Sequence, residues 1–229
     1  MKLDVFVAGE IVDLCIPTRA FAEQSDWYAW FNDRNINRYL YQGLFPNTAE
    51  QQVRFFEENR DKRLLLIVSD KANAIGVISL NNIDFVAKQA DLAMVIGPKC
   101  PRKLRPYVSL EAIARITQHA VEVMGLNRIN SGQHVGLGKW QQRKELLGYR
   151  LEGVLRNGFV KGREVADLMK SSLVYADYAR LVARRGAYWD SLEKMKARIK
   201  QLPDDKFIDQ FVAFMARQGE AYYERVFEL

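Results

Sequence analysis

The sequence predicts an α+β fold, a mixed α/β domain with helices on both faces of one mostly antiparallel sheet, followed by a C-terminal helical extension. Apolar runs of strand length alternate with segments of helical periodicity over residues 1–182, in the order strands, helix, strand, helix, strands. Residues 183–229 carry only helical stripes. We therefore assign them to a separate helical hairpin or extension.

The first third of the chain mixes short strands with helices. Glu10–Pro17 is a β-rich run that stops at a proline, and Val5–Val7 is its expected partner. A helix follows over residues 18–33, with Thr18 as its cap and aromatic residues at roughly helical spacing. Pro46–Thr48 opens a second helix. This helix pair is a candidate wall of a pocket.

The middle third is the most regular part of the sequence. Leu64–Ser69 and Ile75–Leu80 read as a hairpin, and Ala90–Ile96 adds a further strand that ends at a glycine and a proline. An antiparallel meander is the simplest arrangement of these three strands.

A basic loop and a long helix come next. The loop is Lys99–Tyr107, and Ser109 is the expected cap of the helix. Gly125 ends the helix, because glycine accepts the left-handed conformation found there. The pattern then predicts a strand, a short helix and a strand hairpin: Arg128–His134, Lys139–Leu147, Tyr149–Leu155 and Glu164–Met169.

The extension contains two apolar helical stripes separated by Pro203. The first lies between Trp189 and Ile199, and the second between Phe207 and Val226. Each stripe needs an apolar partner, because exposed faces of this kind aggregate in water. The partner is either the sheet domain or another subunit, so a homo-oligomer formed through these helices is one expectation.

Composition excludes several classes of protein. The acidic Asp4 and Glu10 interrupt the N-terminus and argue against a secretory signal, and no apolar run approaches the ~20 residues that span a bilayer. The two cysteines are too few for a disulfide framework and have no metal-ligand spacing, and histidine clusters are absent from the sequence. We therefore expect a cytoplasmic protein with neither a membrane anchor nor a metal site.

The charge balance favours anionic partners. The formal net charge is +6 and the isoelectric point is about 9.3. Such a surplus suits a polyanion, a membrane surface or an anionic small molecule. The densest basic clusters, Lys99–Arg105 and Arg180–Arg185, are short and lie in different contexts. A nucleic-acid-associated role is accordingly the least favoured of the functions considered.

Six segments carry recognisable motifs in a fixed order. They are Trp30–Asp33 with Ile36–Leu40, Ile75–Asp84, Ala90–Gly97, Leu110–Ala112, Gly125–Ile129 and Leu147–Arg156. In this order and spacing the run from Gly9 to about Leu181 resembles the GNAT acyltransferase superfamily. The resemblance is to the branch of ribosomal-protein N-acetyltransferases and nucleotide-linked amino-sugar N-acetyltransferases. It implies a fold in which two strands diverge and bind acetyl-CoA, or another acyl-CoA, between them.

The resemblance also implies where the cofactor binds. The extended arm of acyl-CoA would complete the sheet along Met94, Val95 and Ile96. Its diphosphate would lie at the start of the following helix, near Arg102, Lys103, Arg105 and Tyr107. The family has glycines in this loop, whereas this chain has Pro106 and Val108, or Arg105 and Tyr107, depending on register. Either the cations replace backbone contacts to phosphate, or the loop has lost CoA binding.

Catalysis in the superfamily moves a proton from the amine and returns one to the thiolate. Asp91 matches a position where the family often has a carboxylate base, and the alternative is a strand-end aspartate that faces solvent. His134 follows the second diverging strand, as a proton relay or as a structural histidine. The asparagine and tyrosine usual after that strand have no counterpart here, so the general acid is missing from its usual place.

Tyr39, Tyr41 and Gln42 are the candidate residues for the acceptor, because tyrosine offers a stacking face and a hydroxyl. The expected function is an N-acyltransferase that acts by direct attack of a primary amine of a small molecule on the thioester. A nucleotide-linked amino sugar is slightly favoured over a protein N-terminus. The alternative is a GNAT-like binding or assembly module that lacks acetyl-CoA chemistry.

Overall fold

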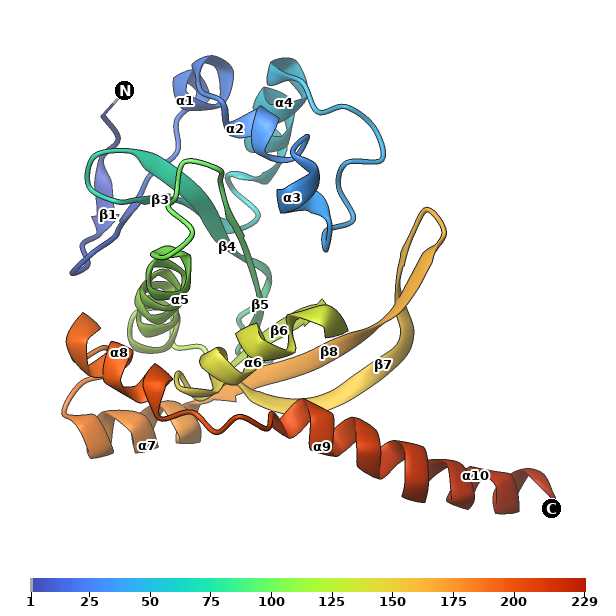
Figure 1. The fold of residues 1–229 in the computed structure, drawn as a ribbon. Helices are drawn as coiled ribbons and strands as arrows, with labels where there is room; N and C mark the ends of the chain where they lie inside the picture. The colour runs from blue at the N-terminus through green and yellow to red at the C-terminus, as the bar shows by residue number, and fades with distance from the viewer. Residues whose placement is uncertain (1) are drawn as a thin grey trace.

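The computed structural model describes residues 2–229, which form an eight-stranded sheet with helices packed around it (Figure 1). The strands lie in the order β1-β2-β3-β4-β5-β6-β8-β7, and only the β5–β6 pair is parallel. Their bounds are β1 (Val5–Val7), β2 (Asp13–Cys15), β3 (Leu64–Ser69), β4 (Ala74–Asp84), β5 (Gln89–Ile96), β6 (Arg128–His134), β7 (Arg150–Lys161) and β8 (Glu164–Val174). The predicted mixed fold with a mostly antiparallel sheet is confirmed.

The central strands are buried on both faces, and each face has its own apolar core. Along β3, Leu66 and Val68 face the helix α5 (Arg105–Glu122), whereas Leu65 and Ile67 belong to the core on the opposite face. Four short helices cover this face of the sheet, as Figure 1 shows, and contribute side chains to that second core. They are α1 (Arg19–Gln24), α2 (Trp27–Trp30), α3 (Arg34–Asn37) and α4 (Ala49–Asn59). The alternation of strand side chains thus explains the continuous apolar runs in the sequence.

The single helix predicted over residues 18–33 is wrong in length, because the chain forms two short helices there and a third, α3, begins just beyond at Arg34. Thr18 caps the first one as expected, since its Oγ1 accepts a hydrogen bond from the backbone N–H of Phe21 at 3.1 Å. Asp33 caps α3 through the N–H of Asn35 at 2.8 Å. A polar side chain that bonds nearby backbone groups competes with a continuous helix. Thr48 caps α4 with a complete capping box, as predicted for the second helix.

The start of α5 also differs from the prediction. The helix begins at Arg105, and Ser109 is buried inside it instead of capping it. Pro106 lies in the first turn, where a missing N–H costs no hydrogen bond and the fixed φ of proline suits the helix. The far end agrees with the sequence, because Gly125 adopts a left-handed φ of 69° just beyond the helix.

Glu111 ties α5 to the segment before β2. Its carboxylate is fully buried and accepts hydrogen bonds from the backbone N–H groups of Glu10, Ile11 and Val12. Arg115, one turn further along the helix, pairs with the same carboxylate at 2.8 Å. A glutamate that belongs to one of the family-like motifs therefore has a structural task, the anchoring of the N-terminal strands.

The second half of the chain adds the strands β6, β7 and β8 and seven more helical segments. These are η1 (Val135–Leu137), α6 (Gly138–Glu145), α7 (Tyr175–Arg185), α8 (Leu192–Lys200), α9 (Phe207–Phe214) and α10 (Glu220–Phe227), with the π-helical turn η2 (Met215–Gly219) between the last two. Met195 of α8 is fully buried in the main core, whereas α9 and α10 extend away from the body (Figure 1). The predicted boundary after residue 182 lies inside α7, and the division into two domains stays a prediction.

Candidate active site

The parallel strands β5 and β6 pair over a short stretch and then separate. Only Gln89–Asp91 pairs with Arg128–Asn130. Beyond these residues β5 is bonded only to β4, and β6 only to β8. The facing edges of residues 92–96 and 131–134 are therefore free to bond a third extended chain. The divergence that the resemblance implied is present, and Met94, Val95 and Ile96 lie along its open part.

Asp91 lies at the closed end of this gap. Its Oδ1 accepts a hydrogen bond from the Nδ2 of Asn130 at 3.1 Å, and its Oδ2 accepts one from the Nδ2 of Asn82 at 2.8 Å. Both oxygens retain lone pairs, because a carboxylate accepts about four hydrogen bonds. Strand alternation places Asp91 on the same face as Ala93, two residues nearer the open end.

His134 and Tyr39, two residues singled out in the sequence, are in contact. Their ring centroids are 4.6 Å apart, and Phe159 meets the imidazole edge-on. The Nδ1 of His134 accepts a hydrogen bond from the N–H of Gly136 at 2.9 Å, so the ring proton of the neutral form is on Nε2. Nε2 lies 3.2 Å from Glu164 Oε1 but without hydrogen-bond geometry. His134 is buried and also caps the turn that follows β6.

The segment between α3 and α4, residues 38–47, crosses to the β7–β8 hairpin and is fastened to it. Lys161 donates from Nζ to the carbonyls of Asn37 at 2.7 Å and Gln42 at 2.6 Å. The hydroxyl of Tyr41 donates to the carbonyl of Gly158 at 2.7 Å. Through these contacts the segment, which we call the clamp loop, joins the two halves of the sheet that the gap separates.

The basic residues before α5 fall into two groups. Arg105 donates from Nε to the carbonyl of Cys100 and from Nη2 to that of Gly97, both at 3.2 Å, so its guanidinium shapes the turn. Arg102 and Lys103 are exposed and, among the described residues, have no ion-pair partner. The N–H groups of Arg105 and Tyr107 already bond the carbonyls of Pro101 and Leu104. Exposed cationic side chains, more than helix N–H groups, remain available for phosphate.

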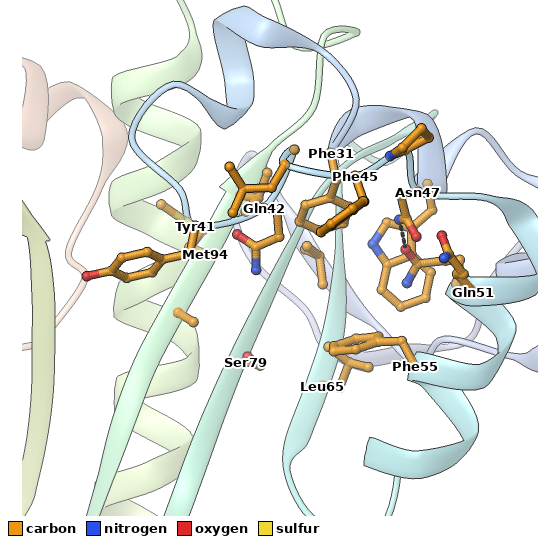
Figure 2. A pocket seen from close by; sticks show the side chains of 18 of the residues that line it. Phe31, Tyr41, Gln42, Phe45, Asn47, Gln51, Phe55, Leu65, Ser79 and Met94 are labelled. Atoms are coloured by element: carbon orange, nitrogen blue, oxygen red, sulfur yellow. Dashed lines mark hydrogen bonds between the residues drawn. The ribbon is translucent and has the colours of Figure 1, made fainter. Parts of the chain in front are cut away.

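A cavity of about 440 Å³ opens beside β5, beneath the clamp loop. Figure 2 shows Phe45 of the loop and Phe55 of α4 on opposite sides of it, with Met94 of β5 and Ser79 of β4 at the sheet. Tyr41 and Gln42, both predicted acceptor residues, also line it, whereas Tyr39 does not. Sequence reasoning missed Gln52, Phe55 and Arg63, which read as ordinary helix and turn positions. The only available signal was an arginine placed directly before a buried strand.

The N-terminal half of the chain, including this cavity, matches a known family. Residues 18–135 match the model of the acetyltransferase (GNAT) domain, which is more than half of the chain. The chain belongs to the GNAT acetyltransferase family. No curated protein sequence matches it.

Solved GNAT structures have the same fold. The microcin C7 self-immunity acetyltransferase MccE, in complex with acetyl-CoA and AMP, is 24% identical, with a TM-score of 0.62 over 72% of this chain and 93% of that one. The spermidine N-acetyltransferase from Vibrio cholerae, in complex with CoA and spermine, is 18% identical, with a TM-score of 0.65 over 74% and 98%. A GCN5-related N-acetyltransferase from Brucella melitensis is 20% identical, with a TM-score of 0.65 over 86% and 96%.

In the segment after β6, where the resemblance places the general acid, this chain has other residues. Lys144 of α6 is buried, and its Nζ donates to Ser131 Oγ at 2.7 Å and Ser171 Oγ at 3.3 Å. These serines lie on β6 and β8 and face α6, away from the cavity. Leu137 and Trp140 offer no acid.

Among residues 2–229, no helix is long and apolar enough to cross a membrane.

Proposed function

We propose that this protein is an acyl-CoA-dependent N-acyltransferase that transfers an acetyl group to a primary amine of a small molecule by direct attack. The observation that carries the proposal is the separation of β5 from β6, which leaves two free strand edges, with a largely apolar cavity beside β5. An extended amide-bearing chain completes such an edge by backbone hydrogen bonds. Family membership supports the reaction class.

The residues along the gap fit acyl-CoA. Met94, Val95 and Ile96 supply a free backbone edge for its extended arm, and the exposed side chains of Arg102 and Lys103 supply charge for its phosphates. Arg105 then acts by shaping the turn that carries them. Bound acyl-CoA supplies an activated thioester. MccE and the spermidine acetyltransferase, which share this fold, were solved with acetyl-CoA and CoA respectively.

Asp91 is the proposed base, because it is a carboxylate on the cavity face of β5, two residues from Ala93 at the cavity wall. Its two asparagine partners hold the carboxylate in one orientation while leaving further lone pairs free. His134 is proposed as a relay, since Tyr39 and Phe159 fix its ring and its Nε2 has no hydrogen-bond partner.

Cofactor binding is tested by calorimetry with acetyl-CoA and desulfo-CoA. We expect micromolar binding, and we expect the double variant Arg102→Glu/Lys103→Glu to weaken it at least tenfold, because it replaces two cations with two anions. Arg163→Glu, an exposed substitution at the β7–β8 turn, is the matched control. Absence of binding at millimolar ligand by a folded protein would reject the proposal.

That negative result would favour a second function, a binding or assembly module built on the GNAT fold. Two features support it: the first-turn N–H groups of α5 already have partners, and α9–α10 presents exposed aromatic side chains. The calorimetry therefore decides between the two functions.

The catalytic assignment is tested with Asp91→Asn. We expect the maximal rate of CoA release to fall by about 100-fold or more, with the affinity for acetyl-CoA nearly unchanged. An unaltered rate removes Asp91 from the mechanism. Asp84→Asn, at the turn of the same β4–β5 hairpin, is the control for removal of one carboxylate, because the amide oxygen can still accept the two backbone hydrogen bonds of that turn.

A further inference from the structure

The cavity beside β5 has the size and lining of a site for an aromatic group. Its volume of about 440 Å³ lies within the usual range of small-molecule sites, about 300–1,000 Å³. Phe31, Phe45 and Phe55 line it together, as Figure 2 shows. The side chain of Phe45 is 83% exposed, which is unusual for a phenylalanine at a cavity wall. A planar ring placed here would cover apolar surface that water now contacts.

Two buried hydrogen-bond donors of the same cavity have no partner. The Nε1 of Trp27 and the Nε2 of Gln52 are both unbonded, although these side chains are 0% and 2% exposed. The orientation of Gln52 follows from its neighbours. The Nδ2 of Asn47 donates to the carbonyl of Tyr28, which can only accept, and to Gln52 Oε1. The amide oxygen of Gln52 is thus satisfied, and its N–H groups are the free donors.

Arg63 adds a positive charge to these donors. Its Nε is buried without a partner, its guanidinium lies over the ring of Phe55 at 5.2 Å, and burial lowers its pKa. Within residues 2–229, no carboxylate lies within ion-pair distance of Arg63, and no acidic residue lines the cavity. Buried donors and an unpaired guanidinium leave unmet hydrogen-bonding capacity, which an anionic oxygen group satisfies.

From this combination we infer that the cavity binds an acceptor amine that carries an aromatic ring and an anionic oxygen group, a carboxylate or a phosphate. The inference rests on the proposed function, because it names the substrate class of the same site. The ring lies among the phenylalanines, and the oxygens accept from Trp27, Gln52 and Arg63. The cavity wall includes Ala93 and Met94, so the amine of such a molecule is next to the β5–β6 gap.

The same lining disfavours polyamines. A polycation needs carboxylates to replace its hydration. This cavity offers it only aromatic faces, which give weaker cation–π contacts, while Arg63 repels it without an acidic residue to compensate. The cavity therefore predicts a different acceptor from that of the spermidine N-acetyltransferase with which the chain shares its fold.

The test measures ligand affinity by calorimetry, without turnover. The probes are L-phenylalanine, phenethylamine, which is the same amine without its carboxylate, AMP as an aromatic phosphate, and spermidine. We expect phenylalanine or AMP to bind at least tenfold more tightly than phenethylamine and spermidine, and the tighter of the two identifies the anionic group. Arg63→Gln should weaken the anionic probes about 10- to 100-fold and leave phenethylamine unchanged. Arg60→Gln, at the exposed end of α4, should change the affinity of neither the anionic probes nor phenethylamine.

The outcomes are decisive even if Arg63→Gln does not fold, because the comparison of probes on the wild-type protein stands alone. Equal affinity for phenylalanine and phenethylamine together with no binding of AMP, or tightest binding of spermidine, overturns the inference. So does a folded Arg63→Gln variant that keeps every affinity. Binding of an anionic probe by a protein that does not bind acetyl-CoA would support the inference and reject the proposed function. Acetylation of spermidine alone, with acetyl-CoA as donor, would support the proposed function and reject the inference.

Discussion

Lys144 is the residue whose environment has the clearest measurable consequence. Its amine is buried between α6 and the sheet, where two serine hydroxyls are its hydrogen-bond partners. Burial lowers its pKa from the ordinary 10.5 to about 7, and Glu145 offsets this only in part. Between these two pH values the unfolded chain holds a proton that the native chain has lost. Stability therefore rises with pH in this window, by at most about 1.4 kcal/mol per unit.

We expect Lys144→Met to remove this dependence. The free energy of unfolding of the variant should exceed that of wild type by the largest amount at pH 7, and this difference should shrink progressively toward pH 10. Urea unfolding at a series of pH values measures it. Lys139→Met, on the exposed side of the same helix, should follow the wild-type curve. A difference between Lys144→Met and wild type that stays constant with pH would mean that the lysine does not titrate in this range.

At the scale of elements, the sequence predicted the strands and helices that follow from a local pattern of residues. The hairpin of β3 and β4 and the strand β5 appeared because apolar side chains run continuously along strands buried on both faces. The start of α5 was missed because Pro106 in a basic stretch reads as loop, although proline suits a first helical turn. Most of the cavity was missed too, since Gln52 and Arg63 gain their meaning only when α4 folds over β3.

The clamp loop gives an element-scale prediction. Lys161 is its main fastening, with charge-assisted hydrogen bonds to the carbonyls of Asn37 and Gln42. We expect Lys161→Met to raise the KM for the acceptor amine about tenfold, because the loop that lines the cavity loses bonds worth about 1.5 kcal/mol. The KM for acetyl-CoA should change little, since the free edge of β5 is not part of this contact.

Steady-state kinetics with each substrate varied in turn measures both constants. Arg163→Met, two residues further along the hairpin and exposed, is the control and should match wild type. Equal increases in both KM values would show that the loop supports the whole gap and not the cavity alone.

At the scale of the whole molecule, two half-sheets meet at a short parallel contact. Three residue pairs join β5 to β6, and the clamp loop crosses the open end of the same gap. The molecule thus closes the gap at one end by strand pairing and bridges it at the other by side-chain contacts. A ligand that fills the gap adds strand-like bonds between the halves, so acetyl-CoA should raise the melting temperature as well as bind.

The C-terminal helix, α9 to α10, packs against α6 only through its first turn, where Ile208 is buried near Gly138, and the rest of it projects from the described chain. Phe207, Phe214 and Tyr222 are 52%, 56% and 55% exposed. Phe207 and Phe214 are seven residues apart, which is about two helical turns. Phe214 and Tyr222 are eight residues apart, but the π-helical turn η2 between them accommodates one extra residue. The three rings therefore lie on the same side of the helix. Aromatic rings aligned in water on a projecting helix favour association, and the occupant we expect is the same stripe of a second copy.

Phe214→Glu tests this association. We expect wild-type protein to show concentration-dependent self-association in sedimentation equilibrium, and we expect the variant to remain monomeric, because a charge at the centre of an apolar contact must be desolvated without a partner. Its melting temperature at low concentration should equal that of wild type, since Phe214 does not pack against the body. Ala216→Glu adds the same charge on the opposite side of the helix and should leave association intact. If wild-type protein stays monomeric over a wide concentration range, the homo-oligomer is refuted, and the stripe of Phe207, Phe214 and Tyr222 would then contact a different partner.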